Sequence, residues 1–264
     1  MRARVVIASL VIACSAAIGH GQTQGRVTRY DLAASPTVEI GANLRIKKIM
    51  GEVGTFMFGT FKAGWKNTPH HHTHEQVNIG VTGAFNIVTP TTPHKVSRLQ
   101  GLIIPPDVMH GNDVTGETES PLLIEFQPVR RVDFPPEREK VAFKTADAPM
   151  PAPADMDLDF RPESPGWQRQ ANGVRMNLKR GKGVAASAWQ FPSAIKDPVE
   201  IRVQVPGAES FVYVLEGSVT AAVGGERHVA PAGTLLVIAP GSPAAQVSAS
   251  GAALLLVLEA GKVQ

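Results

Sequence analysis

The chain has 264 residues, of which 43% are hydrophobic and 19% are charged, and its formal net charge is +3 at pH 7. This length suffices for two domains of ordinary size, and the composition argues against a disordered chain or a bundle of membrane-spanning helices. No basic stripe with interleaved aromatic residues indicates nucleic-acid binding. The composition therefore predicts a soluble globular protein.

The first 22 residues are typical of a cleaved export signal. Arg2 and Arg4 precede an uncharged stretch from Val5 to Ile18, and small and polar residues follow it. Because the stretch is short for a bilayer span, we expect cleavage by residue 22, a periplasmic or secreted protein and no transmembrane anchor in the mature form. Val11 to Cys14 also resembles a bacterial lipobox, so a lipoprotein anchored through Cys14 is the alternative.

Cleavage changes both the charge and the cysteine content. Loss of Arg2 and Arg4 lowers Lys and Arg from 26 to 24 against 23 Asp and Glu, so the net charge falls from +3 to +1. Cys14 is the only cysteine of the chain. A protein cleaved at this segment has no thiol for a disulfide, a nucleophile or a metal ligand.

The remaining sequence predicts an all-β protein of two domains. Val77–Val81 and Phe211–Glu216 favour strands through their β-branched and aromatic content, with Gly83 and Gly217 at turns. Residues 128–165 hold eight prolines among charged residues, which favours an extended connection. We therefore predict a first domain over residues 23–135, a linker over 136–165 and a second domain over 166–264.

The two predicted domains resemble each other at a constant offset in numbering. This offset places Gly83 on Gly217, Pro106 on Pro240 and Glu125 on Glu259 without a gap. The apolar runs SPLLIEF at 120–126 and ALLLVLEA at 253–260 also come together. A repeat of this length indicates two copies of one domain, because solenoid repeats are much shorter.

The densest group of metal-ligating residue types is PHHHTHEQ, residues 69–76. Gly64, His70, His72, Gln76 and Gly83 have the spacing of the first motif of the cupin superfamily, with Gln76 where glutamate is usual. The stretch IPPDVMH, 104–110, resembles the second motif, Pro-x-Gly-x-x-His, with aspartate in place of the glycine and Asn112 two residues after the histidine. The resemblance covers both halves of the chain and implies two tandem jelly-roll β-barrels, a bicupin joined by the proline-rich linker.

This resemblance implies one divalent transition metal bound by His70, His72, Gln76 and His110. In an extended strand alternate side chains share a face, so His70 and His72 point together, and Gln76 has the same parity. His110 comes from a distant strand. Three imidazoles and an amide oxygen suit Fe, Mn, Ni, Cu or Zn better than Ca or Mg, and the neutral glutamine leaves the site one negative charge short of the usual set.

Other interpretations of the histidine segment remain open. It could be an exposed loop that binds metal nonspecifically, and a register with His72, His74 and Asn78 also keeps strand parity. His74 could line the pocket, orient a ligand or carry a proton, and we take it as the candidate catalytic residue. His71 and Glu75 should point away from the site, and we expect Glu75 at the surface.

The second domain lacks these ligands in sequence. The offset carries the four predicted ligands onto Gln204, Pro206, Ser210 and Ala244. Val212 and Val214 predict an apolar filled barrel instead. Function is therefore expected in the first domain.

Two functions compete. A metal with open positions predicts an enzyme acting on a small oxygen-rich substrate, as a dioxygenase or as an isomerase or lyase of sugar acids; the glutamine ligand is similar to that of some cupins that convert unsaturated uronates. The alternative is a non-catalytic metal-dependent protein that binds a carbohydrate or organic acid, and a purely structural role ranks third. A homodimer is expected from the resemblance, because cupins commonly pair through their sheets.

Overall fold

The computed structural model describes residues 22–24, 27–40, 43–67, 69–89, 93–114, 122–128, 157–201 and 207–261. Within these ranges the regular structure is β-strand, apart from one short 3-10 turn, Ala171–Gly173 (η1), so the predicted all-β class is confirmed. No helix in this part of the chain has the length and apolar character of a membrane span. Residues 1–21 of the predicted export signal and residues 129–156 of the proline-rich stretch fall outside these ranges.

The first barrel is built from two antiparallel sheets. Its strands are β3 (Val38–Ile40), β4 (Leu44–Met50), β5 (Gly54–Phe61), β6 (Gln76–Thr82), β7 (Phe85–Val88), β8 (Pro93–Val96), β9 (Gln100–Ile104), β10 (Gly111–Asp113), β11 (Leu122–Pro128) and β12 (Asp157–Asp159). The seven-stranded sheet has the order β12-β9-β6-β11-β5-β4-β3, and the three-stranded sheet has the order β10-β7-β8.

The second barrel repeats this architecture. Its strands are β1 (Gln22–Gln24), β2 (Val27–Asp31), β13 (Gln168–Arg169), β14 (Arg175–Arg180), β15 (Val184–Phe191), β16 (Ile195–Ile201), β17 (Glu209–Glu216), β18 (Ser218–Val223), β19 (Glu226–Pro231), β20 (Thr234–Ile238), β21 (Ala245–Ala249) and β22 (Ala253–Ala260). Its sheets have the orders β1-β2-β20-β17-β22-β15-β14-β13 and β16-β21-β18-β19. The order from β2 to β13 matches that from β12 to β3 in the first barrel, and β1 is an additional strand at the edge.

The backbone conformation of the turns repeats as well. Three pairs of residues related by the constant offset all have positive φ: Gly83 (67°) and Gly217 (75°), Leu99 (63°) and Gly233 (86°), and Asp107 (62°) and Gly241 (74°). The left-handed region is open to glycine and is tolerated by aspartate, which explains why Asp107 can stand where the cupin motif has glycine. The duplication predicted from the sequence is therefore present in the turns as well as in the strand order.

The offset changes in the last strand of each barrel. Phe126 of β11 pairs with Val77, and Leu258 of β22 pairs with Phe211. Val77 and Phe211 are related by the constant offset, whereas Leu258 lies two positions before the one that the offset assigns to Phe126. The gapless alignment of Glu125 with Glu259 is therefore wrong by two positions, and Gln127 is the structural counterpart of Glu259.

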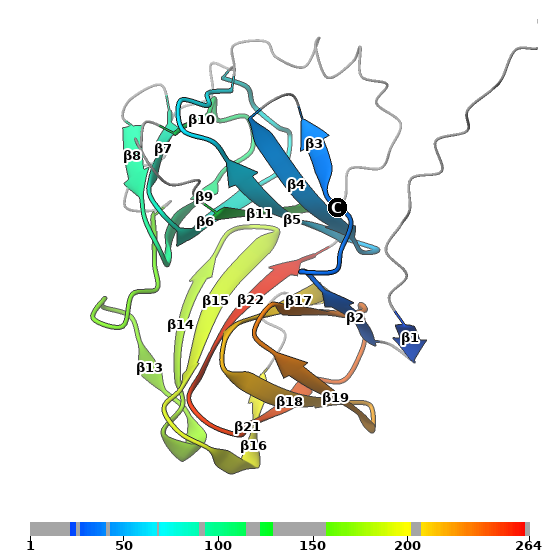
Figure 1. The fold of residues 1–264 in the computed structure, drawn as a ribbon. Coiled ribbons are helices and arrows are strands. Elements are labelled where there is room, and N and C mark those ends of the chain that lie inside the picture. Colours follow the sequence, from blue (N-terminus) through cyan, green and yellow to red (C-terminus); the bar gives the residue numbers. More distant parts are fainter. Residues whose placement is uncertain are drawn as a thin grey trace, which may run out of the picture.

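The large sheet of each barrel is extended at one side by strands from a segment outside that barrel. β2 precedes the first barrel in sequence but pairs with β20 of the second, from Val27 opposite Ile238 to Asp31 opposite Thr234. β12 lies within the predicted linker and pairs with β9 of the first barrel. In Figure 1 the dark blue strands β1 and β2 lie beside the lower, second barrel. The two halves are thus joined by exchanged strands, which the sequence boundaries did not anticipate.

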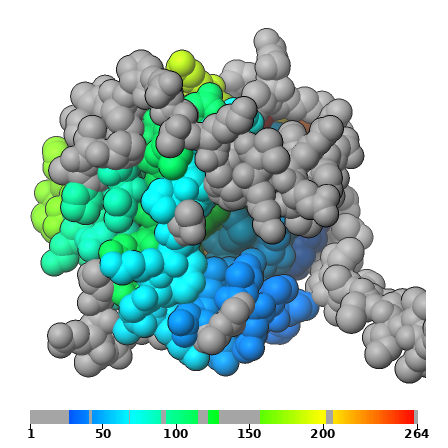
Figure 2. All heavy atoms as spheres, turned by 90° about the horizontal axis from the view of Figure 1, so that it is seen from above, coloured from blue at the N-terminus to red at the C-terminus, as the bar shows by residue number. Residues whose placement is uncertain are grey.

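Three apolar cores follow from strand alternation. One lies inside the first barrel and includes Leu102 and Leu123, and another lies inside the second and includes Val212 and Val214, as predicted. The third is shared by the large sheets of both barrels and includes Phe56 and Phe211. Each buried side chain of this size contributes roughly 1.5–3 kcal/mol. The shared core therefore holds the barrels face to face, and in Figure 2, seen from above, the coloured surface belongs mainly to the first barrel.

Candidate metal centre

The histidine segment is held against the segment before β10 by backbone hydrogen bonds. His70 and His110 form an antiparallel bridge, with His70 N–H donating to His110 O at 2.8 Å and His110 N–H donating to His70 O at 2.7 Å. Asp107 N–H donates to His72 O at 2.6 Å. These bonds bring together two parts of the chain that are distant in sequence.

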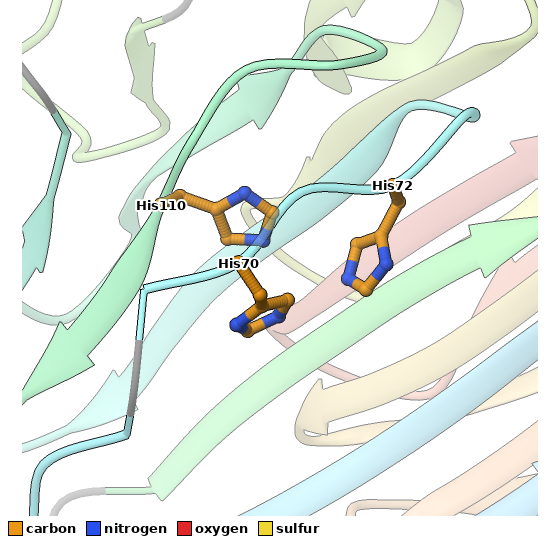
Figure 3. Close-up of side chains that lie close together, drawn as sticks. All are labelled: His70, His72 and His110. Atoms are coloured by element: carbon orange, nitrogen blue, oxygen red, sulfur yellow. The ribbon is translucent and has the colours of Figure 1, made fainter. Parts of the chain in front are cut away.

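The imidazole rings of His70, His72 and His110 converge. Their ring centroids are 4.6 Å apart for His70 and His110, 4.8 Å for His70 and His72, and 5.2 Å for His72 and His110. One nitrogen of each ring lies within 4.8 Å of the others. Figure 3 shows the rings of the two segments turned toward a common point. Such a group of imidazoles could hold a metal ion.

His110 is arranged as a neutral ligand. Its side chain is buried, and its Nδ1 donates to Val108 O at 2.9 Å. The other ring nitrogen, Nε2, takes no part in this hydrogen bond. No described residue forms a hydrogen bond with this buried Nε2. Burial is the main cause that lowers the pKa of His110 from 6.5 to about 4, so the imidazole is unprotonated at neutral pH. A metal-bound histidine typically donates its other N–H to a carbonyl in this way.

Gln76 presents an amide oxygen inside the same barrel. Val77 and Ile79 of β6 belong to the core between the barrels, so Gln76 and Asn78 face the interior. Gln76 is 1% exposed, and its Nε2 donates to Asn78 Oδ1 at 3.2 Å. No described residue forms a hydrogen bond with Gln76 Oε1. A buried acceptor without a donor costs free energy, and a cation at this point would satisfy it.

The residues present fit a transition metal. Three converging imidazole nitrogens suit Fe, Mn, Ni, Cu or Zn, and an added amide oxygen would be compatible with the same metals. His110 Nε2 of this group and Gln76 Oε1 are both buried atoms that lack a hydrogen-bond partner among the described residues. A bound metal would satisfy both.

His74 lies next to this group without being part of it. Its ring stacks on that of His72, with centroids 5.1 Å apart. Its Nε2 is 2.8 Å from Gln127 Oε1, and because an amide oxygen only accepts, Nε2 is the donor in this arrangement. Gln127 thereby fixes which nitrogen of His74 carries the proton.

The remaining predicted residues take other places. His71 lies outside the histidine group, with its Nδ1 3.4 Å from Asp107 Oδ1. Asn78, a ligand in the alternative register, uses Oδ1 to accept from Gln76. The expectation of a surface position for Glu75 is wrong: this residue is 7% exposed and its carboxylate binds backbone N–H groups of the second barrel.

The corresponding end of the second barrel differs in chemistry. Ser210, the counterpart of Gln76, donates through Oγ to Glu259 Oε1 at 3.4 Å. Gln204 and Pro206 lie outside the described ranges. Among residues 157–201 and 207–261, no group comparable to the three histidines is found.

Two polar residues inside the first barrel were not identified from the sequence. Leu123 belongs to the core of this barrel, whereas Ile124 and Phe126 belong to the core between the barrels. Alternation therefore turns Glu125 and Gln127 toward the interior, and Glu125 lies opposite Asn78. The signal was present in LLIEFQ, where polar residues occupy alternate positions of an apolar run.

Two jelly-roll barrels, with converging histidines inside one of them, define the double-barrel cupin fold. No family model matches the chain. Protein SchB of Streptomyces halstedii is 28% identical over 113 residues, which make up 41% of this chain and 81% of SchB.

Solved structures show the same fold at low sequence identity. A cupin 2 conserved barrel domain protein from Leptotrichia buccalis superposes with a TM-score of 0.57 and 11% identity, covering 88% of this chain and 95% of that one. Oxalate decarboxylase from Bacillus subtilis superposes with a TM-score of 0.65 and 11% identity, covering 92% of this chain and 78% of that one. The chain therefore has the cupin fold in two tandem copies.

Proposed function

We propose that the first barrel binds one divalent transition metal through His70, His72, His110 and Gln76. The observation that carries this proposal is the convergence of three imidazoles in the barrel that also contains two buried atoms without partners among the described residues, His110 Nε2 and Gln76 Oε1. Such atoms are rare in folded proteins unless an ion, a ligand or water satisfies them.

We further propose that the protein is an enzyme acting on a small oxygen-rich organic substrate. A bound metal supplies a Lewis acid that polarises a carbonyl, carboxylate or hydroxyl oxygen. The residues of the chain then position the substrate and move its protons. His74 is the proposed proton carrier, because it lies against His72 and because imidazole is the side chain suited to proton transfer near neutral pH.

Gln127 supports this role by orienting His74. Its Oε1 accepts from His74 Nε2 at 2.8 Å, which holds the ring in place and puts the proton of the neutral imidazole on Nε2. General acid and base catalysis of this kind contributes typically about 100- to 10,000-fold to a rate. His74→Ala should therefore lower kcat by roughly this factor while the metal content stays near that of the parent.

The substrate class is tested with panels of small acids and phenols. Oxalate belongs in the panel because oxalate decarboxylase shares the fold, and sugar acids and catechols test the isomerase or lyase and dioxygenase hypotheses. Metal-loaded protein is incubated with each compound with and without dioxygen. Oxygen consumption supports a dioxygenase, and product formed without oxygen supports a decarboxylase, isomerase or lyase.

Saturable binding without turnover would favour the alternative, a non-catalytic protein that binds a carbohydrate or organic acid through the metal. Absence of both turnover and binding across the panel, in protein with a full metal complement, would contradict the proposal of a substrate-binding metal centre.

We also propose that the protein works outside the cytoplasm, on the basis of residues 1–22 alone. Fractionation of cells that express the full chain should place the cleaved protein in the periplasm or medium. A membrane-bound product that is released by Cys14→Ser would instead support the lipoprotein form.

A further inference from the structure

Two buried carboxylates occupy equivalent positions in the two barrels. Glu75 immediately precedes β6, and Glu209 begins β17, one repeat length later in the chain. Their exposed fractions are 7% and 2%. Ionised groups are seldom buried to this degree unless they are paired or hydrogen-bonded.

Each carboxylate binds backbone N–H groups at the hairpin turn of the opposite barrel. Glu75 accepts from Lys182 at 2.7 Å, Gly183 at 2.6 Å and Val184 at 3.1 Å, between β14 and β15. Glu209 accepts from Glu52 at 3.0 Å, Val53 at 2.8 Å and Gly54 at 2.8 Å, between β4 and β5. Three N–H donors around one carboxylate make a strong, charge-assisted contact.

A glycine in each turn makes room for the carboxylate. A Cβ added at Gly181 would overlap the carboxylate of Glu75, and one added at Gly51 would overlap that of Glu209. Gly181 and Gly51 do not have positive φ. A side chain at either position would therefore displace the carboxylate from its turn, for reasons of space rather than of backbone conformation.

The two contacts are alike, but they lie next to different residues. Glu209 is followed by Ser210, which binds Glu259. Glu75 is followed by Gln76, the proposed fourth ligand, and alternation turns Glu75 to the second barrel while Gln76 faces the interior of the first.

The histidine segment is consequently fixed at both of its ends. At its start, the His70 and His110 bridge and the bond from Asp107 to His72 hold it to the first barrel. At its end, Glu75 holds it to the turn that follows β14 in the second barrel. His72 is itself held through its backbone carbonyl, and Gln76 directly follows Glu75 in the sequence.

We infer that Glu75 is a positioning residue of the metal centre, through which the second barrel sets the geometry of the ligands in the first. This inference rests on the proposed metal site. The second barrel, which supplies no ligand, thereby contributes to the geometry of the site. Loss of the Glu75 contact should therefore weaken metal binding more than the accompanying loss of stability explains.

The test uses the equivalent contact of Glu209 as its control. Glu75→Gln and Glu209→Gln each replace one carboxylate that accepts three N–H bonds, in the full-length protein. Thermal unfolding measures the loss of stability in each metal-free variant, and titration with Co²⁺ well below the unfolding temperature measures affinity. The visible absorption spectrum of bound Co²⁺ reports the ligand geometry directly.

We expect both variants to unfold at lower temperature than the parent, and only Glu75→Gln to bind Co²⁺ about 10- to 100-fold more weakly with an altered spectrum, as is typical when a group that orients metal ligands is lost. Equal affinities and equal spectra in the two variants would overturn the inference while leaving the metal site intact. A parent protein that binds no Co²⁺ would refute the metal site itself.

A second pair of variants leaves both carboxylates in place. Gly181→Ala pushes the Glu75 carboxylate out of its turn, and Gly51→Ala does the same to Glu209. The first should reproduce the weaker Co²⁺ binding and the second should not. If Glu75→Gln does not fold, this pair decides the question, and parent-like Co²⁺ binding by Gly181→Ala would overturn the inference.

Discussion

Gln76→Glu tests the feature in which the first motif departs from the usual cupin pattern. Gln76 is 1% exposed and donates through Nε2 to Asn78 Oδ1 at 3.2 Å. A carboxylate at this position loses that donor. Loss of one buried hydrogen bond costs about 1–3 kcal/mol, so the metal-free variant should unfold at a lower temperature.

Asn78 limits this cost. Its Nδ2 is buried and has no hydrogen-bond partner among the described residues. Rotation of the Asn78 amide by half a turn would present this nitrogen to the new carboxylate. The hydrogen-bond part of the loss should therefore lie nearer the lower end of the range, burial of the carboxylate adds to it, and Gln76→Glu with Asn78→Ala should lose more stability than Gln76→Glu alone.

Metal binding should change in the opposite direction. Attraction between a dication and the added charge amounts to several kcal/mol at an effective dielectric constant near 20, and burial of the carboxylate offsets much of it. We expect a net gain of about 1.4–2.8 kcal/mol, which corresponds to roughly 10- to 100-fold tighter binding. Competition with a chelator of known affinity measures this change.

Gln127→Glu is the matched control, because it adds the same charge inside the same barrel at a residue that is not a proposed ligand. Similar gains in both variants would show that long-range charge accounts for the effect. Unchanged metal affinity in Gln76→Glu, with unchanged stability of its metal-free form, would refute the assignment of Gln76 as a ligand.

Two further predictions concern stability. Between the barrels, the ring of Phe211 stacks on Phe56 at a centroid distance of 6.4 Å and meets Phe126 edge to face at 5.1 Å. Phe211→Ala should therefore lower the free energy of unfolding, measured by calorimetry, by about 3–5 kcal/mol. Val229→Ala, at an exposed residue, should change it by less than about 0.5 kcal/mol. Burial lowers the pKa of His110 from 6.5 to about 4, so below pH 6.5 the unfolded chain binds a proton that the folded metal-free protein does not. About 3 kcal/mol of the free energy of unfolding is therefore lost as the pH falls from 6.5 through 4. Unfolding temperatures of metal-free protein from pH 7 to 4 should fall more steeply than those of His110→Ala, and parallel curves would contradict the pKa.

The convergence of His70 and His72 was predicted, but not for the right reason, because residues 71–75 form no regular strand and His70 makes only an isolated bridge to His110. The spacing from Gln76 to Gly83 does fit a strand that ends at a left-handed turn, where Gly83 has a φ of 67°. The motif around His110 supplied the long-range contact. These features are encoded within short stretches, which is why a motif can predict them.

Contacts between the barrels were harder to foresee. In the sequence Glu75 is indistinguishable from a surface glutamate. Its partners are backbone N–H groups in the other half of the chain, and residue types do not reveal which backbone groups form such contacts. The pairing of β2 with β20 likewise joins segments from opposite ends of the chain. Alternation could have identified Gln127, but the two-residue shift of the last strand concealed its equivalence to Glu259.

The metal content of the protein tests the central claim most directly. Elemental analysis of full-length protein purified without an affinity tag should find close to one transition metal per chain. His110→Ala should lose most of it, and His71→Ala, whose side chain lies toward Asp107, should retain it. A parent without bound metal, or equal losses in both variants, would contradict a centre built from His70, His72, Gln76 and His110.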